Sequence, residues 1–264
     1  MKQTERNSNA DKRIPPSAYP VLPVFFSSFF SLLLSIILFF PLNSFARHNA
    51  DNFSSTTISP EEYTLIGKGD NYEVVVVYPG TGNSIVDMEL ALWAKSRANT
   101  FIRSVHGITA SLEIPHTLDI YYESIKASDT TISIIFTSTI TMSAGSPEDG
   151  ITTLTFDLRD GRLLSYPDLF QNTDSLLESF SLISQNALID LFDDLTDLQM
   201  LEFGTSPEPA NFDLFSISPI GLTLYFPPGQ AAPPQKGSLR VNIAIEELSS
   251  FKPRQSLWER KKTQ

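Results

Sequence analysis

Residues 118–141 read LDIYYESIKASDTTISIIFTSTIT, and this stretch decides the fold class. Two runs rich in β-branched and aromatic residues, Leu118 to Ile125 and Thr131 to Thr141, are separated by the turn residues Ala127-Ser128-Asp129. Two such runs joined by a short turn predict a β-hairpin. We therefore expect this part of the chain to form antiparallel strands.

Further strands are predicted on both sides of this hairpin. Upstream, Tyr72 to Tyr78 is a β-branched run that is stopped by Pro79-Gly80. Downstream, after a polar loop from Ser143 to Gly150, the run from Ile151 to Leu158 alternates and ends in a turn that contains Asp160-Gly161. The last third predicts three more strands, and a proline-rich loop follows the second of them: Asn211 to Ser218, Gly221 to Phe226 and Ser238 to Ile245.

Two long helices complete the predicted fold. The first starts after Asn83 or Ser84, either of which can cap it, and leads to Gly107. The second and longest is capped by Asp174-Ser175 and carries apolar residues at spacings of three and four: Leu176, Phe180, Ile183, Ala187, Leu191, Leu195 and Leu198. Strands joined by hairpins and mixed with two helices indicate an α+β fold with a largely antiparallel sheet.

The N-terminus has the layout of an export signal. An uncharged run of twenty residues, 21–40, follows four basic residues and precedes Ser44 and Ala46, small residues at the positions a signal peptidase reads. Cleavage after Ala46 would release a periplasmic or secreted protein, whereas an uncleaved run is long enough to anchor the chain in the inner membrane. Residues 47–60 are polar, rich in Ser and Thr, and read as a linker.

The exported part is acidic and has no cysteine. Without the four basic and two acidic residues of the leader, 15 Lys and Arg face 28 Asp and Glu, a net charge of −13. Such a surface repels nucleic acid and attracts basic proteins. The absence of cysteine excludes disulfides, thiol catalysis and cysteine-bound metals.

Residues 155–170, TFDLRDGRLLSYPDLF, resemble the signature of a bacterial extracytoplasmic domain of unknown function. This domain occurs in RsiV-type anti-sigma factors and beside the catalytic domain of PdaC-type peptidoglycan deacetylases. The block Gly221 to Phe226, with its proline loop and the run to Leu248, resembles the closing strands of that family. The resemblance implies a small N-terminal accessory domain over 61–115, an RsiV-like domain over 116–252 and a tail over 253–264.

The chain departs from the family pattern at several positions. Ser146 stands where many members have a histidine, and Gly229 and Pro234 stand where two tyrosines are common. The roughly twenty residues before the apolar run show no amphipathic helix period with which to hold a sigma factor. An anti-sigma role is therefore not expected.

The residue inventory offers no recognisable catalytic site. The three histidines (His48, His106, His116) form no zinc motif, and no G-x-S-x-G elbow exists. Ser249-Ser250-Phe251-Lys252 matches S-x-x-K without its companion elements. The acidic residues of the second helix read as a solvated face rather than a calcium loop: Asp190, Asp193, Asp194 and Asp197. We expect no cofactor and no metal.

Two hypotheses about function remain. In the first, the protein is a non-catalytic binding module for a basic envelope protein, such as a lysozyme-type muramidase, or for cell-wall glycan. In the second, it is a hydrolase of cell-wall polysaccharide with an unrecognised carboxylate site. The hairpin loop and the proline loop cannot pair regularly and are the segments that we expect to reach a partner. Their candidate ligand-binding residues are Ser146, Glu148, Asp149 and Gln230.

Overall fold

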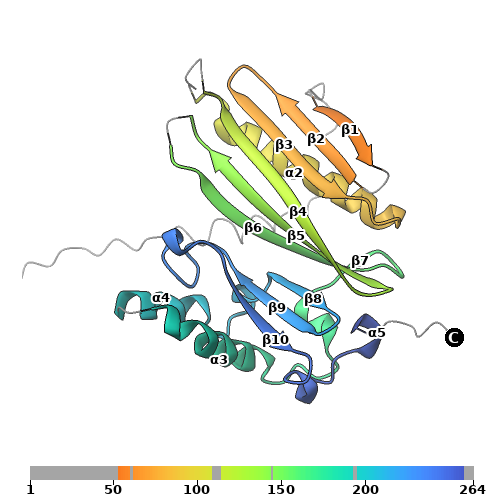
Figure 1. The fold of residues 1–264 in the computed structure, drawn as a ribbon, viewed down its shortest axis with the longest axis vertical. Coiled ribbons are helices and arrows are strands. Elements are labelled where there is room, and N and C mark those ends of the chain that lie inside the picture. The colour runs from red at the N-terminus through yellow and green to blue at the C-terminus, as the bar shows by residue number, and fades with distance from the viewer. Residues whose placement is uncertain (1–52, 60–61, 109–113, 144, 193–194, 259–264) are drawn as a thin grey trace, which may run out of the picture. The chain divides into compact units, whose positions relative to one another are not determined.

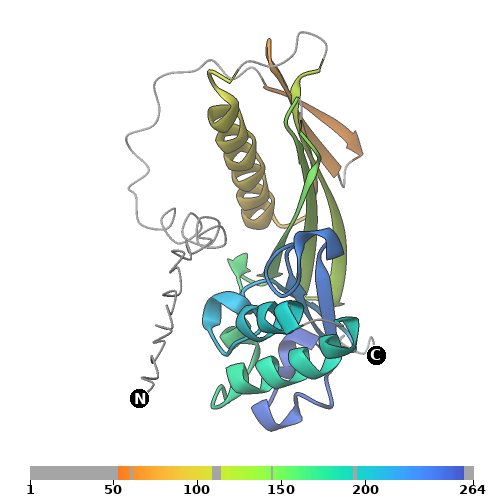
Figure 2. The ribbon, with the colours of Figure 1, turned by 90° about the vertical axis from the view of Figure 1, so that its left-hand side faces the viewer.

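The structure, a computed structural model, describes residues 53–59, 62–108, 114–143, 145–192 and 195–258, with side chains from Glu62 onward. The predicted export signal, residues 1–46, and its alternative as an uncleaved anchor lie outside the described residues. Within the described part, no helix has the length and apolar character needed to cross a bilayer. The predicted α+β class is confirmed: a large, mostly antiparallel sheet and a small sheet are combined with helices (Figures 1 and 2).

The large sheet holds seven strands that follow one another in sequence order. The predicted hairpin forms its centre, with β4 and β5 joined at Asp129-Thr130, as the β-branched runs indicated. All neighbouring strands are antiparallel except β3 and β4. The strands are β1 (Phe53–Ser59), β2 (Glu62–Lys68), β3 (Tyr72–Pro79), β4 (His116–Ser128), β5 (Thr131–Thr141), β6 (Glu148–Asp157) and β7 (Arg162–Leu163).

Helix α2 (Ser84–Val105) makes the crossover that the parallel pair β3 and β4 requires. The helix begins as predicted, because the Asn83 side chain accepts hydrogen bonds from the amides of Ile85 and Val86. Figure 2 shows the helix lying against one face of the sheet. Its apolar side and this face share one hydrophobic cluster, which we call the N-terminal core and which includes Val76, Leu90, Phe136 and Phe156.

The C-terminal part combines a three-stranded antiparallel sheet with short helices. Its strands, in the spatial order β10-β9-β8, are β8 (Phe215–Ser218), β9 (Gly221–Phe226) and β10 (Leu239–Ala244). Its helices are α3 (Leu176–Leu188), α4 (Leu195–Gly204) and α5 (Gln255–Trp258). These elements share a second cluster, the C-terminal core, whose fully buried aromatic residues are Phe170, Phe180, Phe212 and Phe226.

The second long helix was predicted wrongly. The chain leaves the α-helix after Leu188, makes a 3-10 turn at Ile189–Leu191 and becomes helical again only at Leu195. Aspartates disfavour helix interiors, and the like charges of Asp190, Asp193, Asp194 and Asp197 recur at four-residue spacing, which opposes a continuous helix. The break leaves Leu191 about half exposed. Ser175 precedes α3 with a positive φ of 57°, and its side chain makes no capping hydrogen bond.

Four of the expected boundaries do not coincide with those of the described elements. The segment 47–60, read as a linker, contains β1, and β8 begins at Phe215 instead of Asn211. The expected tail, 253–264, contains α5, whose Leu257 and Trp258 are buried in the C-terminal core. The predicted division at 115/116 falls between β3 and β4, which are paired in the same sheet.

Candidate binding face and groove

The motif at residues 155–170 has structural contacts throughout. Phe156 is buried in the N-terminal core, and Leu169 and Phe170 are buried in the C-terminal core. Leu158 is only partly buried and packs against the N-terminal core. These four apolar residues of the motif therefore support the fold.

Asp157 closes the turn that follows this strand. Its carboxylate accepts hydrogen bonds from the main-chain amide of Arg159 (3.0 Å) and from the guanidinium Nε of the same residue (2.8 Å). The guanidinium holds the pKa of Asp157 below its ordinary value, although burial acts in the opposite direction. The same turn also contacts the residue that caps α2, since the side-chain amide of Asn83 donates a hydrogen bond to the Leu158 carbonyl at 2.7 Å. The motif therefore joins the sheet to the start of the helix.

Hydroxyl groups on the large sheet bind the free edge of β8. The amides of Phe215 and Ile217 point away from β9 and donate to Thr153 Oγ1 and Ser133 Oγ, both at 2.9 Å. Ser133 Oγ and Thr155 Oγ1 are also hydrogen-bonded to each other at 2.9 Å. All these residues are buried, so these hydrogen bonds link the two sheets in a site from which water is excluded.

The remaining part of this sheet face, opposite α2, has no covering element among the described residues, and we call it the open face. It consists of the side chains of β2 to β6 that alternate with those of the N-terminal core. Tyr121 lies there with 57% of its surface exposed. Its neighbours along β4 on the same face are Asp119 and Glu123. The other carboxylates of the open face are Glu62, Glu73 and Asp149, and Glu73 forms an ion pair with Lys68 of β2.

Cross-strand register places two of these carboxylates in one row, on either side of Thr139. Asp119 is paired with Thr139, and Thr139 is paired in turn with Asp149 on the next strand. Thr139 Oγ1 donates a hydrogen bond to Asp149 Oδ1 at 2.8 Å. Burial raises the pKa of Asp119, and repulsion from Glu73 adds to this, while a hydrogen bond from Thr117 partly offsets it. The open face is therefore an acidic surface with an aromatic ring at its centre.

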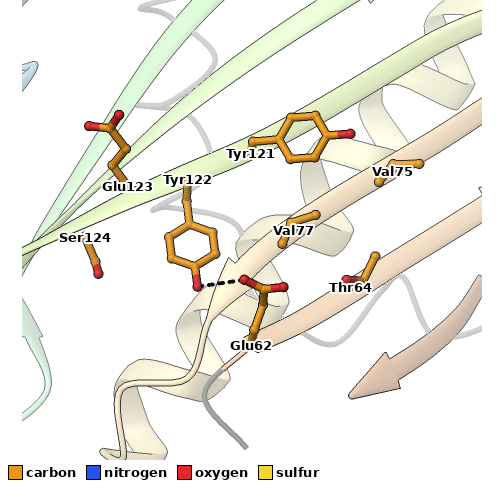
Figure 3. Close-up of a pocket in the computed structure, with 8 residues that line it drawn as sticks. All are labelled: Glu62, Thr64, Val75, Val77, Tyr121, Tyr122, Glu123 and Ser124. Carbon is orange, nitrogen blue, oxygen red and sulfur yellow. Dashed lines mark hydrogen bonds between the residues drawn. The ribbon is translucent and has the colours of Figure 1, made fainter. Parts of the chain in front are cut away.

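A groove opens on this surface where β3 and β4 separate. Their parallel pairing ends at Val76 and Ile120, and beyond this point β4 continues with β5 alone. The space has a volume of about 530 Å³ and is lined by Glu62, Thr64, Val75, Val77 and residues 121–124 (Figure 3). The groove therefore results from the separation of these two strands on the open face.

The polar groups of the groove differ in how they are bonded. Tyr122 reaches across from β4 and donates its hydroxyl hydrogen to Glu62 Oε2 at 3.1 Å (Figure 3). Thr64 is 5% exposed, and its Oγ1 is buried without a hydrogen-bond partner among the described residues. Buried hydroxyls in proteins are usually hydrogen-bonded, so the Thr64 hydroxyl is an exception.

The four predicted site residues do not come together. Ser146 is exposed in the β5–β6 connection, but Glu148 and Asp149 are the first residues of β6 and not part of a loop tip. Gln230 lies in the β9–β10 connection of the other sheet. Its amide nitrogen donates to the carbonyls of Gly204 (2.8 Å) and Asn211 (3.1 Å), so this side chain anchors the proline loop.

The histidines and acidic residues form no metal centre in the described ranges, where no group of three or more potential ligands converges. His106 is the exposed C-cap of α2. His116 is the buried first residue of β4, and its Nδ1 accepts a hydrogen bond from the amide of Ser143 at 3.1 Å. This contact ties the start of the β5–β6 connection to the sheet.

The groove residues Thr64, Tyr121 and Glu123 were not singled out from the sequence. A signal for the two β4 residues was present, since Asp119, Tyr121 and Glu123 alternate with the apolar Leu118, Ile120 and Tyr122. Such alternation indicates a strand with one buried face and one solvent-facing face. The groove forms because β3 and β4 separate, and no pattern of neighbouring residues in the sequence indicates where this separation occurs.

Comparison with known proteins gives similarity of fold. The sequence matches no protein-family model and no curated protein. The structure is similar to the crystal structure of a DUF3298 family protein from Pseudomonas aeruginosa, with a TM-score of 0.53 and 14% identity, over 74% of this chain and 98% of that one. A DUF3298 family member from Bacteroides fragilis matches with a TM-score of 0.46 and 13% identity, over 75% and 92% of the two chains. At 14% identity, the similarity to the Pseudomonas aeruginosa protein shows a shared fold alone.

Proposed function

We propose that the protein is exported to the cell envelope and acts there as a non-catalytic binding module for a basic protein partner. The observation that carries this proposal is the open face, where the exposed Tyr121 lies among carboxylates of which, within the described part of the chain, only Glu73 forms an ion pair, with Lys68. A positive partner surface would be attracted to this face over long range, and aromatic residues are favoured anchors at interfaces. The motif's resemblance to the outer domains of RsiV and PdaC proteins supports the same location and role.

Binding accounts for this surface better than hydrolysis does. Glu62 and Glu123 line the same groove and are the carboxylates that a hydrolase of cell-wall polysaccharide would use. However, the two carboxylates of a glycosidase flank one bond together, whereas Figure 3 shows the Glu123 carboxylate directed away from Glu62. Cell-wall glycan remains the alternative ligand.

The location is tested by the N-terminus of the protein made in its native host. We expect a mature N-terminus at Arg47 in the periplasm or medium, because Ser44 and Ala46 mark the cut site. Mass spectrometry of the purified protein reads this end directly. Recovery of the intact chain in the membrane fraction would favour the anchored form instead.

Charge reversal at Glu148 and Asp149 tests the role of the acidic face. Both residues are exposed, and Asp149 belongs to the open face. With a lysozyme-type muramidase as the basic probe, we expect Glu148→Lys with Asp149→Lys to slow association about tenfold at low salt, since steering accelerates association by that order or more. Added salt should remove most of the difference, because the charges are then screened.

The control carries the same net charge but places it elsewhere. Glu178 on α3 and Glu202 on α4 are exposed and lie outside the open face, so Glu178→Lys with Glu202→Lys should leave the association rate much closer to that of the natural protein. Biolayer interferometry measures the rates, and circular dichroism shows that each variant is folded. Equal rates for the natural protein and both variants at all salt concentrations would rule out the acidic face.

A further inference from the structure

The groove between β3 and β4 combines apolar, aromatic and negatively charged surface, and a ligand group that fills it has to match all three. Val75 and Val77 make its floor apolar, and the exposed ring of Tyr121 forms one wall. Carboxylates lie at two sides, Glu62 from β2 and Glu123 from β4. An extended side chain with an apolar stem and a positive head matches this arrangement, because its stem can lie on apolar surface while its charge meets the carboxylates.

The hydroxyl of Thr64 is an independent sign that the groove takes a ligand. Thr64 is 5% exposed and lines the groove, and its buried Oγ1 has no hydrogen-bond partner among the described residues. Figure 3 shows the oxygen on the side of Thr64 that faces Glu62 and Val77. A buried hydroxyl without a protein hydrogen bond is unfavourable, so a ligand donor that reached it would offset the cost of its burial.

We propose that this groove is a subsite for an arginine side chain of the basic partner. The guanidinium is planar, stacks on aromatic rings and carries five N–H donors in a fixed fork. It can therefore stack on Tyr121 while its donors meet the second oxygen of Glu62 and Thr64 Oγ1, and Glu123 adds negative charge on the other side of the groove. A lysine ammonium offers three donors from one point and is more strongly hydrated, so it fits the spread of these acceptors less well. This subsite rests on the proposed function and deepens it.

The direct test uses short peptides with the mature full-length chain, residues 47–264. Three hexapeptides of glycine and serine contain one central arginine, lysine or citrulline, the last being a neutral analogue of arginine. In NMR titrations we expect the arginine peptide to shift the amides of Thr64, Tyr121 and Glu123, the lysine peptide to bind more weakly, and the citrulline peptide to bind at least tenfold more weakly than arginine, since hydrogen bonds to charged groups are the strong ones.

Three variants separate the contributions of the groove. Tyr121→Ala and Glu123→Gln replace exposed side chains, and each is expected to weaken the arginine peptide about tenfold without affecting folding. Thr64→Val keeps the shape and removes the hydroxyl, so it should stabilise the fold slightly while still weakening the peptide several-fold. Glu202→Gln, on α4, is the control and should bind as the natural chain does. A purely structural role for Thr64 would leave peptide binding unchanged.

The outcomes distinguish the subsite from the proposed function. If a muramidase binds in a salt-dependent manner and its affinity is unchanged by Tyr121→Ala and Glu123→Gln, the subsite is wrong and the proposed function stands. If the arginine peptide occupies the groove but no basic protein binds, the proposed function is wrong in its choice of partner. A groove that responds to a chitin oligosaccharide and not to the arginine peptide would overturn the subsite in favour of a glycan.

Discussion

Replacing Phe156 with alanine is expected to lower the free energy of unfolding by about 3–5 kcal/mol. The side chain is 2% exposed and lies in the N-terminal core, on the sheet face that α2 covers. Its removal would lose the transfer free energy of the ring and leave a cavity between the helix and the sheet, and rigid neighbours on β5 cannot fill that space fully. Urea denaturation of the mature protein, followed by circular dichroism, measures the change.

The control for Phe156→Ala is its cross-strand neighbour Leu163. Leu163 pairs with Phe156 across β6 and β7 but is 51% exposed, so Leu163→Ala should cost well under half as much. The comparison separates burial from the removal of apolar atoms. A Phe156→Ala variant as stable as the natural protein would mean that the strand register of β6 is incorrect.

Gly204→Ala is expected to destabilise the C-terminal core by about 1–3 kcal/mol or more, although it adds a single methyl group. A Cβ at this position would lie 2.1 Å from the carbonyl oxygen of Gln230 and 2.7 Å from the Cα of Ala231. Both are main-chain atoms, so the clash cannot be relieved by a side-chain rotation. The end of α4 and the proline loop would have to move apart, which would strain the Gln230 hydrogen bonds to Gly204 and Asn211.

A second glycine, Gly145, serves as the control for whether the loss of stability in Gly204→Ala comes from the clash with the main chain of Gln230 and Ala231. At Gly145 a Cβ would meet its nearest atom at 3.5 Å, an ordinary contact, in an exposed connection. Gly145→Ala should therefore change stability by less than about 0.5 kcal/mol, as surface substitutions usually do. Thermal denaturation of both variants makes the comparison. Equal stability of Gly204→Ala and Gly145→Ala would contradict the predicted clash.

Sequence patterns predicted the elements whose signals are local. The alternation of the β4–β5 hairpin and the Asn83 cap of α2 depend on neighbouring residues, and both are confirmed. The break after Leu188 was missed because the apolar spacing continues through it, while the opposing effects of the aspartates are individually small. Apolar periodicity alone therefore overestimated the length of that helix.

The candidate site was less predictable than the fold. Glu148 and Asp149 were predicted as binding residues from their charge and their expected position in a loop, and Asp149 does lie on the open face. The groove itself depends on how β3 and β4, separated by α2, are aligned and where they part. No local pattern encodes that register, because it results from packing of the whole crossover. For the same reason, the anchoring role of Gln230 became visible only with Gly204 and Asn211 placed beside it.

The docking of β8 onto hydroxyl groups has a consequence for behaviour in a crowded envelope. A strand at the edge of a sheet normally offers its amides and carbonyls to any extended chain that meets it, and this is a common start of aggregation. Here the outward amides of Phe215 and Ile217 are already engaged by Thr153 and Ser133. Ordinary edge strands are protected by charge or by proline, but this one is protected by side chains of its own molecule. It is therefore withheld from intermolecular β-pairing for as long as the two sheets stay together.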